Sequence, residues 1–268
     1  MDVLIGCSGY SYDDWKGTFY PPDLKKGDFL KFYEKHFPIV EINATYYTYV
    51  GEKSFRSMIG RTERLLFSVK LHRDFTHGRD YSEEERTRFL SSLKPLVERG
   101  RLKALLAQFP YSFHYSTENL DYVRRLRDDF QPLPMAIEFR NSHWKRDDVF
   151  DAIEEMEQTA LVNVDAPPIR GLFTGPWMSV GEFDYIRLHG RNATKWYNHR
   201  EAWERYDYEY SQEELKEIAR RITSMRNGNK MIFFNNHYRG KGPRNARKLM
   251  EILGVDYGNT GGMQRLFV

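Results

Sequence analysis

The chain of 268 residues has one cysteine, no long apolar run and almost no excess of charge. The lone Cys7 excludes an internal disulfide and a zinc site built on several thiolates, and it is typical of a reducing compartment. No apolar run approaches the ~18 residues of a membrane-spanning helix, and no basic leader precedes the first apolar segment. These absences predict a cytoplasmic protein with no membrane partner.

Two well-known motifs are also lacking. No GxGxxG fingerprint follows any predicted strand, which argues against a doubly wound, dinucleotide-binding sheet. No HExxH motif or other close spacing of metal ligands is present. The net charge of +3 names no partner by itself, because positive and negative residues nearly cancel.

What the chain does contain is a series of eight short apolar runs rich in β-formers, separated by helical patterns. The runs begin at Val3, Val40, Phe67, Leu105, Ala136, Val162, Tyr185 and Phe233. Capping-box patterns open two of the predicted helices, at Ser82 and at Ser211. The connection after the sixth run is rich in proline and glycine and shows no helical stripe. The pattern predicts one domain over residues 1–268, an α/β (β/α)8 TIM barrel whose sixth helix is short or missing.

Nearly every predicted strand ends in polar side chains, and the carboxyl ends of barrel strands meet on one face. Candidate catalytic residues there are Glu41, Lys70, Glu138, Asp165 and His189. Candidate substrate-binding residues from the same strand ends are Asn43, His72, Gln108, Arg140, Arg187 and Asn235. Three cations and three carboxylates at one mouth favour a site for an anionic substrate, since desolvating six charges without a ligand is costly. The alternative is a structural ion-pair network that fills the top layer of the barrel.

These residue types suggest roles. Arg140 and Arg187 are forked donors suited to a phosphate or carboxylate, and burial can tune Lys70 towards neutrality. Glu41 or Glu138 could act as a general base, with His189 or His72 as an acid. The sequence names no cofactor. A divalent metal on the carboxylates and histidines is an alternative that we do not favour, because the neighbouring cations would repel it.

Aromatic residues are abundant, at 15 %, and many lie in long connections predicted after strands, over residues 8–22 and 190–210. Rings that could stack on bases or sugars are Tyr10, Trp15, Tyr46, Trp196 and Tyr197. Basic residues near the last two could contact phosphates. The alternative is that these rings pack the loops against the barrel.

Motifs along the whole chain resemble those of a TIM-barrel family, domain of unknown function 72, the YecE-like proteins. The matching segments include residues 6–10, 40–43, 67–70, 138–140, 187–190 and 234–236. Departures such as Cys7, Tyr10 and the Gln-Phe-Pro-Tyr sequence after the fourth strand leave the charged strand ends untouched. The resemblance implies the barrel fold, with relatives of the endonuclease IV and sugar-isomerase kind, and it implies no activity.

We therefore expect an enzyme that acts on an anionic small molecule or a nucleic acid, with hydrolase or phosphodiesterase chemistry favoured. One alternative is a non-catalytic nucleic-acid-binding protein that uses the basic, aromatic loops. Sugar isomerisation, which needs a divalent metal, is a third hypothesis. The sequence leaves the oligomeric state open.

Overall fold

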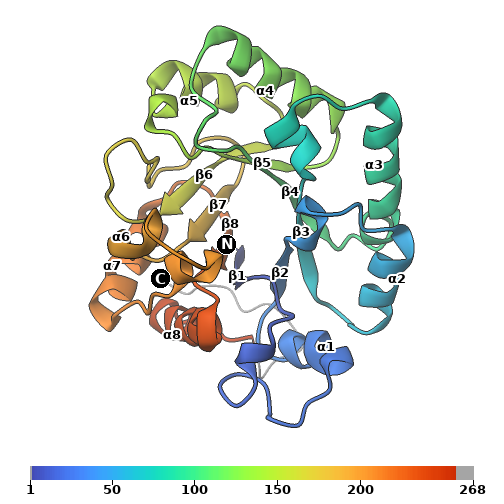
Figure 1. Ribbon diagram of the computed structural model, residues 1–268, viewed down its shortest axis with the longest axis vertical. Helices are drawn as coiled ribbons and strands as arrows, with labels where there is room; N and C mark the ends of the chain where they lie inside the picture. The colour runs from blue at the N-terminus through green and yellow to red at the C-terminus, as the bar shows by residue number, and fades with distance from the viewer. Residues whose placement is uncertain (1, 258–268) are drawn as a thin grey trace.

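A computed structural model describes residues 2–257, and its strands form a closed parallel barrel in chain order, with β8 pairing to β1. The strands are β1 Asp2–Ser8, β2 Ile39–Ile42, β3 Leu66–Lys70, β4 Leu102–Gln108, β5 Met135–Glu138, β6 Thr159–Asp165, β7 Asp184–Leu188 and β8 Asn229–Phe234. The α-helices are α1 Phe29–Glu34, α2 Glu52–Gly60, α3 Glu83–Glu98, α4 Thr117–Asp129, α5 Asp147–Glu154, α6 Ala193–Trp196, α7 Gln212–Ser224 and α8 Lys241–Leu253. The helices surround the strands in a ring (Figure 1), so the predicted barrel is confirmed.

Local signals explain where the helices begin and where one is missing. Ser82 and Ser211 form complete capping boxes, each side chain accepting a hydrogen bond from a backbone N–H of the first turn. No α-helix lies between β6 and β7. The connection instead folds back along β6, where Gly175 pairs with Val164 in an antiparallel bridge. The side-chain amide of Asn163 fastens the same connection by hydrogen bonds to both backbone groups of Met178.

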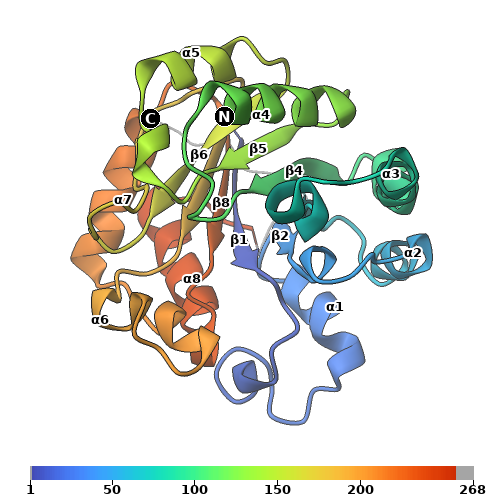
Figure 2. The ribbon, with the colours of Figure 1, turned by 45° about the horizontal axis from the view of Figure 1, so that its top comes forward.

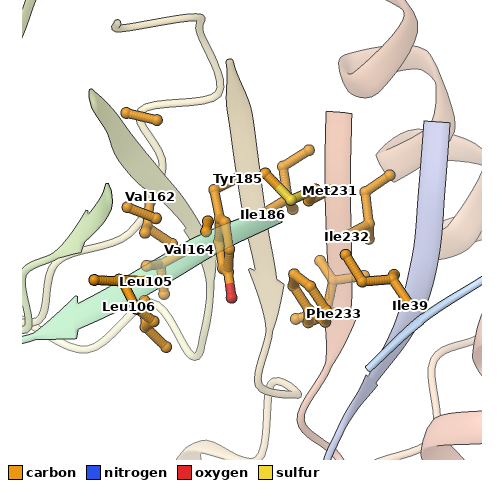
Figure 3. Close-up of a cluster of buried hydrophobic side chains, with 14 of the residues drawn as sticks. Ile39, Leu105, Leu106, Val162, Val164, Tyr185, Ile186, Met231, Ile232 and Phe233 are labelled. Atoms are coloured by element: carbon orange, nitrogen blue, oxygen red, sulfur yellow. The ribbon is translucent and has the colours of Figure 1, made fainter. Parts of the chain in front are cut away.

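Apolar side chains fill the interior of the barrel, away from the carboxyl ends of the strands. Figure 3 shows Val162, Val164 and Phe233 around the ring of Tyr185, and all four are fully buried. Register pairs Val162 with Tyr185 and Val164 with Arg187, so these residues share the inward face of β6 and β7. The interior is therefore a packed core, and the polar side chains inside the barrel gather at the carboxyl ends of the strands.

The long connections leave the carboxyl ends of the strands together. In Figure 2 the connections that follow β1 and β7 both lie along the lower edge of the molecule, beyond the strands. The indole Nε1 of Trp15, after β1, donates to the carbonyl of His237, after β8, which ties two of these connections together. None of the helices within residues 2–257 is both long enough and apolar enough to span a bilayer.

Candidate functional site

Six charged or titratable side chains gather at the carboxyl ends of four strands. We call them the barrel-mouth cluster: Glu41 of β2, Lys70 of β3, Glu138 and Arg140 at the end of β5, and Arg187 and His189 at the end of β7. Side chains alternate along a strand, which turns these members of each strand inward while their apolar neighbours face the helices. Acids and bases that are distant in the sequence thus lie together at one end of the barrel.

Arg187 lies at the centre of the cluster and uses its whole guanidinium on two carboxylates. Its Nε and Nη2 donate to Glu41 at 3.0 and 2.7 Å, and its Nη1 donates to Glu138 at 2.6 Å. All three side chains are buried. Burial alone would lower the pKa of Arg187, but the two carboxylates raise it above its usual range. Each nitrogen of the Arg187 guanidinium already donates to a carboxylate and the side chain is only 2 % exposed, so its geometry does not favour the predicted grip on a substrate anion.

Glu138 and His189 form a second buried pair. The imidazole Nε2 lies 3.3 Å from Glu138 Oε1, and Nδ1 lies 2.9 Å from the amide nitrogen of Asn235. Asn235 can only donate there, so we assign the proton of a neutral imidazole to Nε2. Burial and then Arg140 lower the pKa of His189 to about 3. Burial would raise the pKa of Glu138, but Arg140, Arg187 and His189 outweigh it and hold that pKa well below its usual range. At neutral pH Glu138 is therefore an anion and His189 is uncharged.

Two buried hydroxyl groups, those of Tyr185 and Ser68, lie between the cluster and the apolar core. The Tyr185 hydroxyl donates to Glu41 Oε2 at 2.7 Å and lies 2.8 Å from Ser68 Oγ. Neither Tyr185 nor Ser68 was among the predicted site residues. Both stand two positions before a predicted residue on the same strand face, before Arg187 and Lys70, so strand alternation would have found them.

Lys70 differs from the other cations of the cluster because it has no acidic partner. Its Nζ donates to the neutral amide oxygen of Gln108 at 2.7 Å and lies 4.3 Å from the centre of the Tyr46 ring. Its side chain is only partly exposed. Burial, with repulsion from Arg187 and Arg140, lowers the pKa of Lys70 to about 7, against attraction from Glu138 and Glu41. The amine is thus close to half protonated at neutral pH.

Arg140 is the cation of the cluster that is least engaged. Its Nε lies 2.7 Å from Glu138 Oε1, but the N–H direction makes no hydrogen bond, and this buried nitrogen has no hydrogen-bond partner within residues 2–257. Four further buried polar atoms among these residues also lack a partner, namely Ser8 Oγ, Asn43 Oδ1, Arg205 Nε and Asn236 Oδ1, and the first two come from strand ends of the mouth. Ser8 lies beside Glu41 in the β1–β2 register, and Asn43 follows Glu41 on the same face. Unpartnered buried polar groups are costly in a stable fold and are typical of a ligand site.

His77 lies beside this group on the turn Asp74–Gly78. Its ring meets the Tyr46 ring edge-on at 5.0 Å, and Thr76 Oγ1 lies 3.0 Å from its Nδ1. Burial, then Lys70 and Arg140, lower the pKa of His77 to about 4, so its imidazole is neutral at pH 7. Lys70 and Arg140 are therefore the charged groups that face this side of the mouth.

Two predicted members lie elsewhere. Asp165 points outward from β6, where Arg191 grips both carboxylate oxygens and the Tyr210 hydroxyl donates to Oδ1 at 2.7 Å. With Arg191 it borders a separate cavity of about 380 Å³ against α7. His72 stacks on Tyr49 at 4.1 Å and pairs with Asp74 at 2.9 Å. Neither residue joins the barrel-mouth cluster.

The predicted stacking rings divide into buried and available ones. Trp15 and Trp196 are 0 % and 3 % exposed and pack inside the loops, and Tyr10 is partly buried against the core. For the two tryptophans the packing alternative holds. The Tyr46 ring covers the Lys70 amine. Tyr197 is 58 % exposed at the rim, and its pKa is raised by burial although the nearby Arg140 opposes the rise. Tyr47 and Tyr111 were not among the predicted stacking rings, but both are exposed on the connections after β2 and β4.

The carboxylates of the cluster are committed to arginines rather than to a metal. Within residues 2–257 no group of three or more His, Cys, Asp or Glu side chains is arranged to hold a metal ion. Glu41 and Glu138 are each bound by Arg187, and the remaining acidic candidate, Asp165, faces the other way. The groups of the mouth that remain for a substrate are its cations, amides and hydroxyls.

Comparisons with known proteins agree with this picture of the fold. The family model described as "Protein of unknown function DUF72" matches residues 4–265. The UPF0759 protein YunF of Bacillus subtilis (strain 168) is 29 % identical over 282 residues, with 98 % of each chain covered. The crystal structure of a DUF72 family protein from Thermotoga maritima MSB8 shares 38 % identity with a TM-score of 0.86, covering 94 % of this chain and 99 % of its own. One from Enterococcus faecalis V583 shares 28 % identity with a TM-score of 0.84, covering 98 % and 100 %.

Proposed function

The chain belongs to the DUF72 family, whose description assigns no activity, and we propose from the barrel mouth that it is an enzyme acting on a phosphate-bearing or other anionic substrate. Cleavage of a phosphate ester by water is the reaction we favour. The observation that carries the proposal is the pair formed by Lys70 and Arg140. Lys70 has no acidic partner, and the Arg140 side chain, although it lies 2.7 Å from Glu138, makes no hydrogen bond among the described residues.

The charges of the cluster leave a place for an anion. Two carboxylates face three cations, so one positive charge is in excess even though Arg187 pairs with both carboxylates and Arg140 with Glu138. Burial and Arg187 lower the pKa of Lys70 most, and repulsion from Arg140 adds to them; a bound phosphate would relieve the repulsion between Lys70 and Arg140. Arg140 would supply forked donors to the phosphate oxygens, and Lys70 would supply a compact charge. Binding of an anion should in turn raise the pKa of Lys70.

Lys70 also has the acid-base properties that ester cleavage needs. A group with a pKa near 7 transfers protons efficiently at neutral pH. In the proposed reaction the water oxygen attacks phosphorus and releases a proton to solvent. The ester oxygen leaves with the bonding electrons and takes a proton from the Lys70 ammonium, which is then protonated again from solvent. Glu138 and His189 are less suited to this role, because their pKa values lie far below 7.

The test is hydrolysis of p-nitrophenyl phosphate and bis(p-nitrophenyl) phosphate by the full chain, with the K70M and R140Q variants. Removing a proton-transfer group or an anion donor costs on the order of 100-fold in rate or more. R73Q is the matched control, since Arg73 is 65 % exposed after β3 and its ion pair with Asp74 spans 4.0 Å. Equal turnover by K70M, R140Q and R73Q would end the proposal, and so would the absence of both turnover and phosphate binding.

A second candidate, nucleic-acid binding without catalysis, is favoured by the exposed tyrosines. Tyr47, Tyr111 and Tyr197 follow three different strands and are 76 %, 43 % and 58 % exposed. Stacking on such rings is worth about 1 to 3 kcal/mol per base. If this candidate holds, a single-stranded oligonucleotide should bind with steep salt dependence, and Y47A with Y197A should weaken it about tenfold or more. In that case K70M should bind as wild type does.

A further inference from the structure

Several other lysines of the chain pair their amines with carboxylates, whereas Lys70 does not. Lys195 contacts Glu204 at 2.7 Å, Lys230 contacts Asp184 at 2.7 Å, and Lys241 contacts Asp207. A carboxylate partner keeps an ammonium protonated and so removes its lone pair from chemistry. Lys70 meets only the Gln108 amide and the Tyr46 ring, with two guanidinium groups near it. An unprotonated lysine amine in such surroundings is a nucleophile.

We propose that Lys70 forms an imine with an aldehyde or ketone carbonyl of a phosphate-bearing substrate whose phosphate binds Arg140. This inference rests on the proposed anion site and adds a covalent activity to it. The substrate class is the open-chain form of a sugar phosphate, either free or as an abasic site of a nucleic-acid strand.

The unpartnered polar atoms of the mouth fit such a substrate. Ser8 Oγ and Asn43 Oδ1 are buried without a hydrogen-bond partner among residues 2–257, and both are able to accept a hydrogen bond from a hydroxyl group. A polyhydroxy chain would supply those donors, and its phosphate would supply the anion for Arg140. A plain phosphate ester without hydroxyl groups would leave Ser8 and Asn43 unpaired.

The covalent step balances without any oxidant or reductant. The Nζ lone pair forms a bond to the carbonyl carbon, and the C=O electron pair moves to oxygen. A proton passes from nitrogen to that oxygen, giving a carbinolamine. After the hydroxyl takes one more proton from solvent, it leaves as water, and the nitrogen is left doubly bonded to carbon as a protonated imine. Water reverses the step and returns the free amine.

The experiment traps this imine with sodium cyanoborohydride, which reduces it to a stable secondary amine. The full chain is incubated with glyceraldehyde 3-phosphate, with glyceraldehyde, and with an oligonucleotide that carries one abasic site. Intact mass and peptide mapping then identify the labelled lysine. The first and third substrates distinguish the free sugar phosphate from the nucleic-acid source, and glyceraldehyde measures the contribution of the phosphate.

The expected result is labelling at Lys70 at least about tenfold faster than at Lys195, because at pH 7 an amine with a pKa near 7 is largely available and an ordinary lysine is not. The rate should rise with pH through about 7, and R140Q should lose about tenfold with the phosphorylated aldehyde but not with glyceraldehyde. K70R should lose the label, whereas K195R should keep it.

Labelling spread evenly over surface lysines, or no label on Lys70 with any of the three carbonyl compounds, would overturn the inference. Phosphate binding separates that failure from failure of the proposed function. If inorganic phosphate binds the wild type and not R140Q while Lys70 is never trapped, the anion site stands and the imine is wrong. If phosphate does not bind either, both are wrong.

Discussion

Replacing each of two arginines, Arg187 and Arg140, separates the structural part of the mouth from the part that we assign to the substrate. Arg187→Gln leaves Glu41 and Glu138 buried without the three hydrogen bonds that now neutralise them. Breaking a buried ion pair in this way costs about 3 to 5 kcal/mol. For a chain of this size 1 kcal/mol shifts the melting temperature by roughly 2 to 4 °C, so R187Q should melt about 6 to 20 °C lower.

Arg140→Gln should behave differently. The Arg140 side chain makes no hydrogen bond within the described residues, and Glu138 keeps Arg187 and His189 when the 2.7 Å ion pair with Arg140 is removed. We expect a loss smaller than that of R187Q, about 1 to 3 kcal/mol, or roughly 2 to 12 °C. The same variant should lose phosphate binding, whereas R187Q, where it remains folded, should keep part of it.

The assay is thermal and urea unfolding followed by circular dichroism, at pH 7 and at lower pH. In the wild type the depressed pKa of Glu138 gives stability that is present above its unfolded pKa of about 4.5 and is lost as pH falls. Arg187 helps to hold that pKa low, so the difference in free energy of unfolding between wild type and R187Q should decrease below pH 4.5. An equally large difference for R140Q would show that Arg140 is as structural as Arg187, and would refute its assignment to the substrate.

Three further outcomes follow from the same contacts. His189→Gln should make the free energy of unfolding less dependent on pH between 6.5 and 3. Folding lowers the pKa of His189 from 6.5 to about 3, so the unfolded wild type binds the proton more readily and wild-type stability decreases as the pH drops through this range. Urea midpoints between pH 6.5 and 3 measure the effect. Lys70→Met should abolish the wild-type gain in stability between pH 7 and 10.5, where the unfolded chain binds more protons, and should stabilise the protein by about 1 kcal/mol at pH 7 after allowance for partial exposure. Tyr185→Phe removes one donor to Glu41 and should cost about 1 to 3 kcal/mol in urea unfolding without changing phosphate affinity.

The barrel and most of its mouth could be predicted because strand alternation is a local signal. Apolar residues between Glu138 and Arg140 and between Arg187 and His189 predict which side chains share a face, and the structure confirms the convergence. The absence of an α-helix between β6 and β7 could be predicted in the same way, because proline and glycine replace the helical pattern there.

Asp165 could not be placed for a physical reason. Both faces of a barrel strand are buried, so the alternation of Val162, Asn163, Val164 and Asp165 gives a phase but no direction. The structure turns the valines inward, beside Tyr185 and Arg187, and Asp165 outward. A sequence likewise cannot tell a packed ring such as Trp15 from an exposed one such as Tyr197, because that depends on which loops meet.

The division of the arginines was also beyond the sequence. Arg140 and Arg187 look equivalent as residues after a strand, and only distances across the barrel show that one is fully used by Glu41 and Glu138 and the other is not. The same holds for Lys70, whose neutral partner Gln108 comes from a different strand.

An anion held between Lys70 and Arg140 can be tested by NMR of protein labelled with ¹³C at the lysine ε carbons. We expect one lysine signal, absent from K70R, that titrates near pH 7 and whose pKa rises when inorganic phosphate is added, with no such rise in R140Q. Lysine signals that all titrate near 10.5 and ignore phosphate would contradict it.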